Sequence, residues 1–312
     1  MEKQQGQART VLLTVVAMTA FATNSVLCRM ALGAHAIDAA SFTAVRLASG
    51  AGTLAVVALF VRTGRIFTSG SWLSGLQLFL YAAAFSFAYL SLSAGTGSLI
   101  LFGSVQATMI VSGLRSGERP HVLQWLGLAI AIAGLIYLVF PGITAPSPHG
   151  SILMALAGIA WGLYSLRGRG ARDPICQTTG NFIKAAPFSL VVLATSAQGV
   201  HAAPEGILLA VLSGSLASGI GYVIWYTALR GLSSTRAASV QLSVPVLAAF
   251  GGVIFLAEVV TLRLVIASVL IVGGVALTVI AKELKAEKGP GNPRTAQPEV
   301  GSCSIRRRKD DE

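Results

Sequence analysis

Two short stretches decide the fold: residues 113–120, Gly-Leu-Arg-Ser-Gly-Glu-Arg-Pro, and residues 253–260, Val-Ile-Phe-Leu-Ala-Glu-Val-Val. In each, an apolar segment ends in a small residue and a glutamate before a second apolar segment, and the glutamates lie 140 residues apart. The same offset pairs Arg29 with Arg169, Phe42 with Phe182 and Gly134 with Gly274. Because one offset aligns charged landmarks and a repeated hydropathy profile, we predict two copies of one unit.

The composition is typical of a membrane protein. Of 312 residues, 54% are hydrophobic and 11% are charged, and the mean hydropathy is +0.73. A water-soluble domain could not enclose this much apolar surface in a single core. A helix needs about 20 mostly apolar residues to cross the hydrocarbon layer. Ten such segments are predicted, at residues 10–31, 36–61, 72–91, 97–114, 121–140, 150–166, 177–197, 206–229, 233–256 and 261–281.

These segments are predicted to be helices. They are rich in Ala, Leu, Val and Gly, and they show no sustained alternation of apolar and polar residues, which argues against a transmembrane barrel. Five segments per copy is an odd number, so the second copy is inverted relative to the first. The expected fold class is therefore an all-α integral membrane protein with ten transmembrane helices, arranged as two inverted five-helix repeats.

Basic residues are distributed unevenly among the connections. If the N-terminus is cytoplasmic, 19 of the 23 Lys and Arg residues lie in inner loops and termini, and only Arg29 and Arg263 lie in outer loops. This bias predicts the plasma (inner) membrane with both termini cytoplasmic. The net charge of +11 does not indicate nucleic-acid binding, because the cations are scattered beside membrane ends without interleaved aromatic residues.

The expected domain organisation follows from the repeat. It consists of a cytoplasmic N-terminus (1–9), a first repeat (10–140), an outer linker (141–149), a second repeat (150–281) and a disordered cytoplasmic tail (282–312) that is rich in Pro, Gly, Ser and charge. Glu118 is expected in an inner loop and Glu258 in an outer one. Inverted halves can exchange conformations, which is the physical basis of alternating access in secondary transporters. Duplication kept only for packing is the alternative.

Several sequence landmarks together resemble a known family. They are Thr23-Asn24-Ser25, Arg29, Phe42 to Arg46, Gly117-Glu118, Gly134, Trp161-Gly162, Pro245, Ala257-Glu258 and Gly273-Gly274. With ten spans in two repeats, the chain resembles the drug/metabolite transporter superfamily, with EamA-type repeats. It departs from the family pattern at Phe21-Ala22, where Trp-Gly is frequent, and at Val105, which matches Pro245. The resemblance implies a central cavity lined by spans one, three, four, six, eight and nine, with spans five and ten at the periphery.

Polar side chains at membrane depth mark a candidate pathway, because each is costly unless it faces protein or water. Arg46 in the second span and Lys184 in the seventh would favour an anionic substrate group if they face the cavity. Near an interface, either side chain can instead extend to the membrane surface. The other candidates for substrate binding are Asn24, Tyr89, Gln106, Trp161, Tyr164, Tyr222, Trp225, Tyr226, Gln241 and Pro245.

Each of these candidates also has a structural interpretation. Gln106 and Gln241, near the middles of two spans, can bind substrate or bond to neighbouring helices. Tyr222, Trp225 and Tyr226 share one helical face, which is either a substrate wall or an interfacial aromatic belt.

Pro245, two glutamates and two glycines are expected to shape or stabilise the helices. Pro245, at the centre of the ninth span, is predicted to kink the helix and free the Gln241 carbonyl for a substrate or a hinge. Structural roles, as caps or partners of nearby donors or as close packing sites, are expected for Glu118, Glu258, Gly134 and Gly274.

The absence of acidic residues constrains the mechanism. No Asp or Glu lies in the middle of a predicted span, so no carboxylate proton relay is expected unless Glu258 or Asp38 titrates at the outer mouth. No catalytic motif, metal-ligand spacing or cofactor motif occurs in the sequence.

We therefore expect a secondary transporter for a small organic metabolite or drug-like solute, not an enzyme, and fold-level analogy favours export. The alternatives are a non-transporting membrane sensor or assembly subunit, or an intramembrane enzyme. The expected partners are a small-molecule substrate and the lipid bilayer, and a homodimer is left open.

Overall fold

The computed structural model describes residues 2–61, 69–115, 122–140, 142, 145–168, 171, 173–196, 200–232, 237 and 240–287. Within these residues the regular structure is helical, apart from one isolated bridge between Ile37 and Ala202. The helices are α1 (Glu2–Gly33), α2 (Ala39–Phe60), α3 (Trp72–Ala88), α4 (Ala94–Arg115), α5 (Val122–Val139), α6 (Pro148–Gly168), α7 (Pro174–Thr195), α8 (Pro204–Leu212), the π-helix η2 (Ser213–Ile220), α9 (Gly221–Leu229), α11 (Ser243–Leu256) and α12 (Leu262–Glu287). α8, η2 and α9 follow one another without a break.

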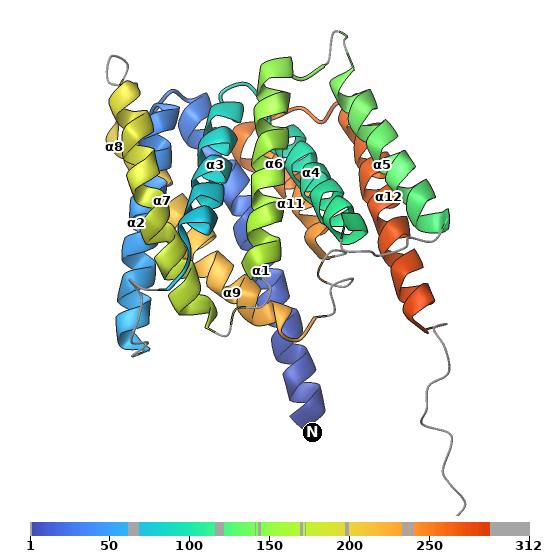
Figure 1. The fold of residues 1–312 in the computed structure, drawn as a ribbon. Helices are drawn as coiled ribbons and strands as arrows, with labels where there is room; N and C mark the ends of the chain where they lie inside the picture. The colour runs from blue at the N-terminus through green and yellow to red at the C-terminus, as the bar shows by residue number, and fades with distance from the viewer. Residues whose placement is uncertain are drawn as a thin grey trace, which may run out of the picture.

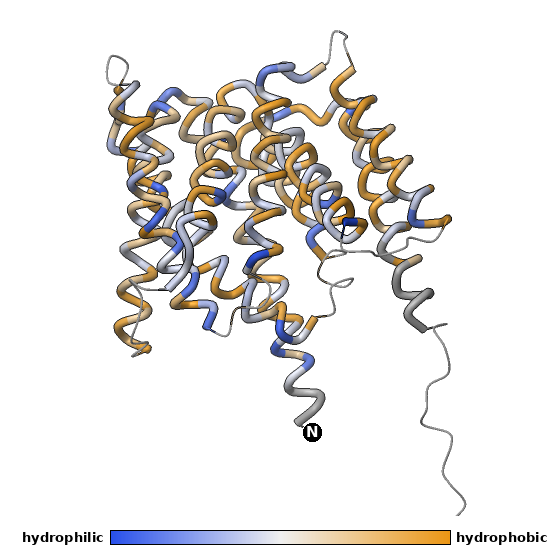
Figure 2. Tube along the Cα trace, in the orientation of Figure 1, coloured by the Kyte–Doolittle hydropathy of each residue, from blue (hydrophilic) through white to orange (hydrophobic). Residues whose placement is uncertain are grey.

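The helices are long and apolar enough to form a membrane protein. Within the described residues, six segments have the length and hydropathy to cross a membrane, and three shorter apolar helices accompany them. Hydrophobic residues make up much of the helices, with hydrophilic residues at many of the helix ends and at a few positions within the bundle (Figure 2). Phe60, Val122 and Ile254 are among the many large apolar residues left exposed, which is the pattern of a lipid-facing surface.

Local sequence signals begin several helices. Asp38 caps α2 by accepting from Ser41 N at 2.9 Å, and Asp173 caps α7 by accepting from Cys176 N at 3.1 Å. Each cap satisfies an amide that has no partner within the helix. α7 and α8 start with proline, which lacks the N–H that a first-turn residue would leave unpaired.

The helices alternate in direction and pack into one bundle (Figure 1). α1 packs against α8, η2, α9 and α11, while α6 packs against α3 and α4. α2 packs against α7 on one side, and α5 packs against α12 on the other. The start of α1 and the end of α12 lie at the same end of the bundle, which we term the terminal end; the other is the distal end (Figure 1).

Glycines allow the α5–α12 pair to approach closely. A Cβ atom added to Gly274 would lie 2.5 Å from the Gly127 carbonyl oxygen, and one added to Gly134 would lie 2.7 Å from Leu270 Cβ. Small residues at such positions let helix backbones pack at van der Waals distance in a membrane.

The structure differs from the sequence prediction in three elements. α1 starts at Glu2, whereas the span was predicted from residue 10. The eighth predicted span contains the π-helix η2 in place of regular α-helix. In the ninth, predicted from residue 233, Ala237, Val240 and Gln241 are helical and Leu242 interrupts the helix before α11 begins at Ser243. Glu118 and the tail from residue 288 lie outside the described residues.

Candidate functional site

Arg46 lies at the centre of the candidate site. It is on α2 and only 1% exposed. Its Nε donates to Ser218 Oγ at 3.1 Å, and its Nη2 donates to the hydroxyls of Tyr81 at 3.1 Å and Tyr222 at 3.4 Å. The guanidinium carbon also lies over the rings of Tyr81 and Phe85, at 5.1 and 4.9 Å from their centroids. A desolvated cation gains substantially from such ring faces.

The cation has neutral partners in place of a carboxylate. The one ion pair among the described residues joins Arg29 and Glu258, and no Asp or Glu is among the buried side chains there. The Nη1 atom of Arg46 is buried without a hydrogen-bond partner. Burying a charge without an opposite charge is expensive, so this arrangement calls for an explanation in terms of function.

Asn24 extends the polar cluster to α1. Its Nδ2 donates to the Tyr81 hydroxyl at 3.3 Å, and its Oδ1 accepts from Ser213 Oγ at 2.6 Å. Because Ser213 opens the π-helix, this bond ties α1 to η2. Five helical elements, α1, α2, α3, η2 and α9, therefore share one hydrogen-bonded network around Arg46.

The π-helix brings its serines to this network. A methyl group built on Gly214 would lie 2.1 Å from Arg46 O and from Ser49 Oγ, so only glycine lets η2 lie this close to α2. π-Helical segments are rare and occur frequently at functional sites. Here the wider turn places Ser213 toward Asn24 and Ser218 toward Arg46.

Aromatic rings form a cavity beside the polar cluster. The cavity has a volume of about 10 Å³ and is lined by Phe21, Asn24, Ser25, Tyr81, Phe85, Leu101, Phe102, Trp161 and Tyr222. Trp161 stacks at 4.6 Å from the Tyr222 ring and at 5.0 Å from the Tyr81 ring, measured between centroids. Three lining residues, Tyr81, Phe85 and Tyr222, also contact Arg46. The volume admits about one water molecule, so a larger ligand requires the rings to move apart.

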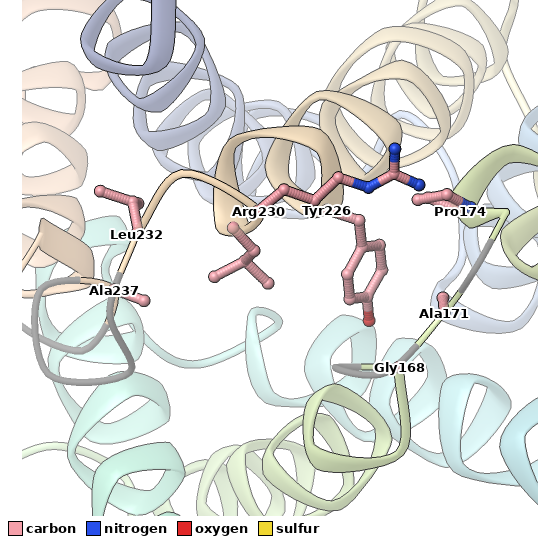
Figure 3. A pocket seen from close by; sticks show the side chains of 8 residues that line it. Gly168, Ala171, Pro174, Tyr226, Arg230, Leu232 and Ala237 are labelled. Atoms are coloured by element: carbon pink, nitrogen blue, oxygen red, sulfur yellow. The ribbon is translucent and has the colours of Figure 1, made fainter. Parts of the chain in front are cut away.

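A second, larger hollow of about 70 Å³ lies toward the terminal end, between α6, α7 and α9. Figure 3 shows its lining, with the Tyr226 hydroxyl directed toward Gly168 and the Arg230 side chain extending toward Pro174. The Tyr226 ring lies 6.5 Å from that of Tyr164, which in turn lies 5.5 Å from Trp161. A row of aromatic side chains thus connects this hollow with the central cavity.

A charged contact joins several helices at the distal end. Arg29 Nε on α1 lies 3.3 Å from Glu258 Oε1, and Glu258 also accepts from Ala94 N at the start of α4. Arg29 Nη1 donates to Tyr89 O at 3.0 Å. Ala257, in the left-handed conformation with φ 50°, ends α11 and directs Glu258 toward this contact.

The sequence-based candidates divide into two groups. Asn24, Arg46, Trp161 and Tyr222 meet in the central cluster. Three others lie next to it: Trp225 against Phe21, and Tyr164 and Tyr226 along the aromatic row.

The remaining candidates lie elsewhere. The Tyr89 hydroxyl donates to Ala94 O near the distal end. Gln106 borders a narrow space between α4, α5 and α12. Gln241 Nε2 donates to Ala237 O. Lys184 Nζ donates to Ser69 O, in the connection before α3.

The kink predicted at Pro245 stays a prediction, and the helix is interrupted at Leu242, three residues before the proline. Pro245 is the third residue of α11, and Leu242 is the N-cap. Amides in the first turn have no intrahelical partner, so proline removes no helical hydrogen bond there. Gln241 lies in a helical turn before this interruption, and Pro245 lies just after it.

Several residues of the site were not among the sequence-based candidates: Phe21, Ser25, Tyr81, Phe85, Leu101, Phe102, Ser213 and Ser218. Tyr81, like Tyr89, is a tyrosine inside an apolar segment, and this feature could have identified it as a candidate. Ser213 and Ser218 lie in a run of small residues that is more typical of helix packing. Within the described residues, no group of three or more His, Cys, Asp or Glu side chains is placed to hold a metal ion.

The EamA-like transporter family profile matches residues 8–140 and 148–280. An uncharacterized protein of Pseudomonas aeruginosa is 50% identical over 269 residues, covering 86% of this chain and 94% of that protein. A probable amino-acid metabolite efflux pump of Escherichia coli is 26% identical, covering 66% of this chain and 76% of the pump. A solved crystal structure matches with a TM-score of 0.63 at 21% identity, covering 88% of this chain and 98% of that one, which supports the fold alone.

Proposed function

The chain belongs to the EamA-like transporter family, and we propose that it moves a small organic solute across the plasma membrane by alternating access. That it is a multi-pass membrane transporter follows from the family and the apolar helices. The single observation that carries the proposal further is the buried network around Arg46, which lies beside an aromatic cavity. Polar and ionisable groups inside a membrane bundle are expensive and mark substrate pathways.

The packing of the helices supports two inverted repeats of five spans each. In this assignment α1 to α5 form the first repeat, and α6, α7, the α8–η2–α9 segment, α11 and α12 form the second. If the two repeats are exchanged, the contact between α1 and α11 becomes the contact between α6 and α4. In the same way, the contact of α1 with the α8–η2–α9 segment becomes the contact of α6 with α3. All four of these helix contacts are present in the structure. The pairs α2–α7, α4–α11 and α5–α12 convert into themselves. This agrees with a two-fold axis in the membrane plane.

The two ends of the molecule support a conformation closed at the distal end. There the Arg29–Glu258 pair joins α1, α4 and α11. At the terminal end, the 70 Å³ hollow below Tyr226 offers a route toward the central cavity. With cytoplasmic termini, as the basic residues predict, the route would open to the cytoplasm. An exporter loads its substrate from that side, and the E. coli relative is named a probable amino-acid metabolite efflux pump.

Counterflow tests the transport function. Purified protein in sealed liposomes is loaded with unlabelled solute, and uptake of the labelled solute is followed across a panel of metabolites. A carrier gives transient, saturable accumulation; a scaffold or sensor gives none, and an enzyme gives a changed product. Absence of exchange for every solute, with folded protein in the membrane, would refute the proposal.

Transport is expected without strict coupling to protons. No carboxylate is buried in the described part of the bundle, so no side chain there offers a proton relay. Flux and internal pH measured together in the same liposomes test this. Stoichiometric proton movement that persists after substitution of both Glu258 and Asp38 would show that the expectation is wrong.

A further inference from the structure

We infer that the substrate is a small organic anion with a ring-sized apolar group, whose oxyanion binds at Tyr81 and Tyr222 and is neutralised by Arg46. The inference rests on the proposed transport function and specifies the solute. It follows from three features of the central cluster: the charge of Arg46, the hydrogen-bond donors beside it and the aromatic lining of the cavity.

The charge of Arg46 selects an anion. Arg46 is 1% exposed, and its guanidinium donates to the hydroxyl groups of Ser218, Tyr81 and Tyr222. Hydroxyls and ring faces reduce the cost of burial but leave the charge itself unbalanced. An oxyanion in the adjoining cavity would supply the missing opposite charge.

The hydrogen-bond donors select an oxyanion. The Tyr81 and Tyr222 oxygens each accept a bond from Arg46 Nη2, and the two phenols also lie within hydrogen-bonding reach of each other, so one O–H of the pair is left to donate into the cavity. Both tyrosines line the cavity. Arg46 Nη1 is a further buried donor without a partner. A planar carboxylate, which accepts several bonds at once, matches this set of donors.

The aromatic residues that line the cavity indicate the chemistry of the rest of the substrate. Six of the nine cavity residues are aromatic: Phe21, Tyr81, Phe85, Phe102, Trp161 and Tyr222. Rings arranged edge to face around a cavity favour a flat apolar group. The lining contains no carboxylate, and the Asn24 amide oxygen already accepts from Ser213. An ammonium group would therefore find no opposite charge, which disfavours zwitterionic amino acids.

Ligand-induced thermal stabilisation of the purified full-length protein tests this inference. The probes are phenylacetate, its neutral isostere phenylacetamide, zwitterionic phenylalanine, ring-free acetate and chloride. We expect phenylacetate to bind at least about tenfold more tightly than each of the others. Equal binding of phenylacetamide or phenylalanine would overturn the inference. So would stabilisation by chloride alone with no added effect of phenylacetate, since the site would then hold an inorganic anion.

Variants assign the effect to Arg46. In Arg46→Gln, the preference for phenylacetate over phenylacetamide should fall from about tenfold to less than about twofold. Lys184→Gln is the matched control, because it removes a cation from the neighbouring α7 that bonds outside the cavity, and it should leave the preference unchanged. If Arg46→Gln does not fold, Tyr81→Phe and Tyr222→Phe each remove one donor and should weaken phenylacetate alone, by about threefold to tenfold. Retention of the full preference in the variants that fold would overturn the inference.

Counterflow of the same probes separates this inference from the proposed function. If phenylalanine or phenylacetamide exchanges as well as phenylacetate, in both wild type and Arg46→Gln, the protein is a transporter and the anion inference fails. If phenylacetate exchanges and Arg46→Gln reduces only that flux, both stand. If no solute in the wider metabolite panel exchanges and phenylacetate does not bind, both fail.

Discussion

Asp38 fastens two connections at the distal end of the bundle. Its Oδ1 accepts from Ser41 N at 2.9 Å, and its Oδ2 accepts from His201 N at 3.0 Å. Its own amide donates to His201 O at 2.8 Å. Partial burial alone would raise the pKa of Asp38, but the hydrogen bonds from Ser41, His201 and Ala40 outweigh it and lower the pKa. The ionised carboxylate is therefore the form that the fold favours.

Acid should weaken this connection. Because the pKa of Asp38 is lower in the folded protein, its contribution is complete above the unfolded-state pKa of about 3.9 and is lost as pH falls through the folded-state pKa. The melting temperature of Asp38→Asn should therefore fall less between pH 6 and pH 3 than that of wild type. Asp173→Asn, at the cap of α7, is the control and should follow wild type more closely. Parallel curves for wild type and Asp38→Asn would contradict this account.

The identity of a residue predicts how costly its polar side chain is inside the membrane, but not which way that side chain points. Arg46 and Lys184 are both cations at membrane depth, yet Arg46 is buried among Tyr81 and Tyr222 while Lys184 reaches Ser69 O. Which way each points depends on the rotation of its helix, and that is set by packing against other helices. Nothing local to residue 46 or 184 encodes this rotation.

The contact between η2 and α2 requires a glycine. Gly214→Ala would place a methyl group 2.1 Å from Arg46 O, so the two helices would have to separate. We expect a loss of about 1–3 kcal/mol in the free energy of unfolding, as for other overpacked sites. Gly52→Ala on α2 is the matched control, because nothing lies within 4 Å of an added Cβ there, and it should be neutral or stabilising. Denaturant unfolding in detergent measures both, and equal effects would show that the contact is loose.

The Arg29–Glu258 contact holds three elements together. Glu258→Gln keeps the shape of the side chain and removes the charge that pairs with Arg29 and accepts from Ala94 N. The side chains of Arg29 and Glu258 are 27% and 16% exposed, so the pair is partly screened and we expect a shift in conformation more than a loss of folding.

Cysteine accessibility measures this shift. A cysteine at Ser25, inside the central cavity, should react faster with a small water-soluble reagent added from the distal side when Glu258→Gln is present. Glu205→Gln, at an exposed position in the first turn of α8, is the control and should leave the rate unchanged. An unchanged rate in Glu258→Gln would mean that the pair does not keep this end closed.

Hydropathy predicts that helices exist, but it predicts their interruptions poorly. The blocks at residues 36–61 and 150–166 lie close to α2 and α6. The π-helix at Ser213–Ile220 and the start of α11 at Ser243 have no hydropathy signal, because the sequence around both remains apolar. Whether a backbone widens its turn or ends there depends on what packs against it, as Gly214 does against α2.

At the scale of the whole molecule, the 140-residue repeat carried the most information. It relates Arg29 and Glu258 to positions in opposite halves, and the structure brings these two side chains together across 229 residues of chain. The repeat also explains why aligned positions such as Gly134 and Gly274 both lie on the same helix pair, α5 and α12. It could not reveal that Phe21 and Phe85 complete the cavity, because neither residue is polar or charged and neither stands out when the two halves are aligned.

Orientation in the membrane follows from the distribution of basic residues and can be tested directly. The α5–α6 connection lies at the distal end and the α6–α7 connection at the terminal end (Figure 1). In a background with Cys28, Cys176 and Cys303 replaced by alanine, Ser147→Cys should react with a membrane-impermeant maleimide in intact cells. Ala171→Cys should react only after permeabilisation, because 19 of 23 basic residues are assigned to the cytoplasmic side. The reverse pattern would place the hollow below Tyr226 outside the cell and turn the proposed export route into one for uptake.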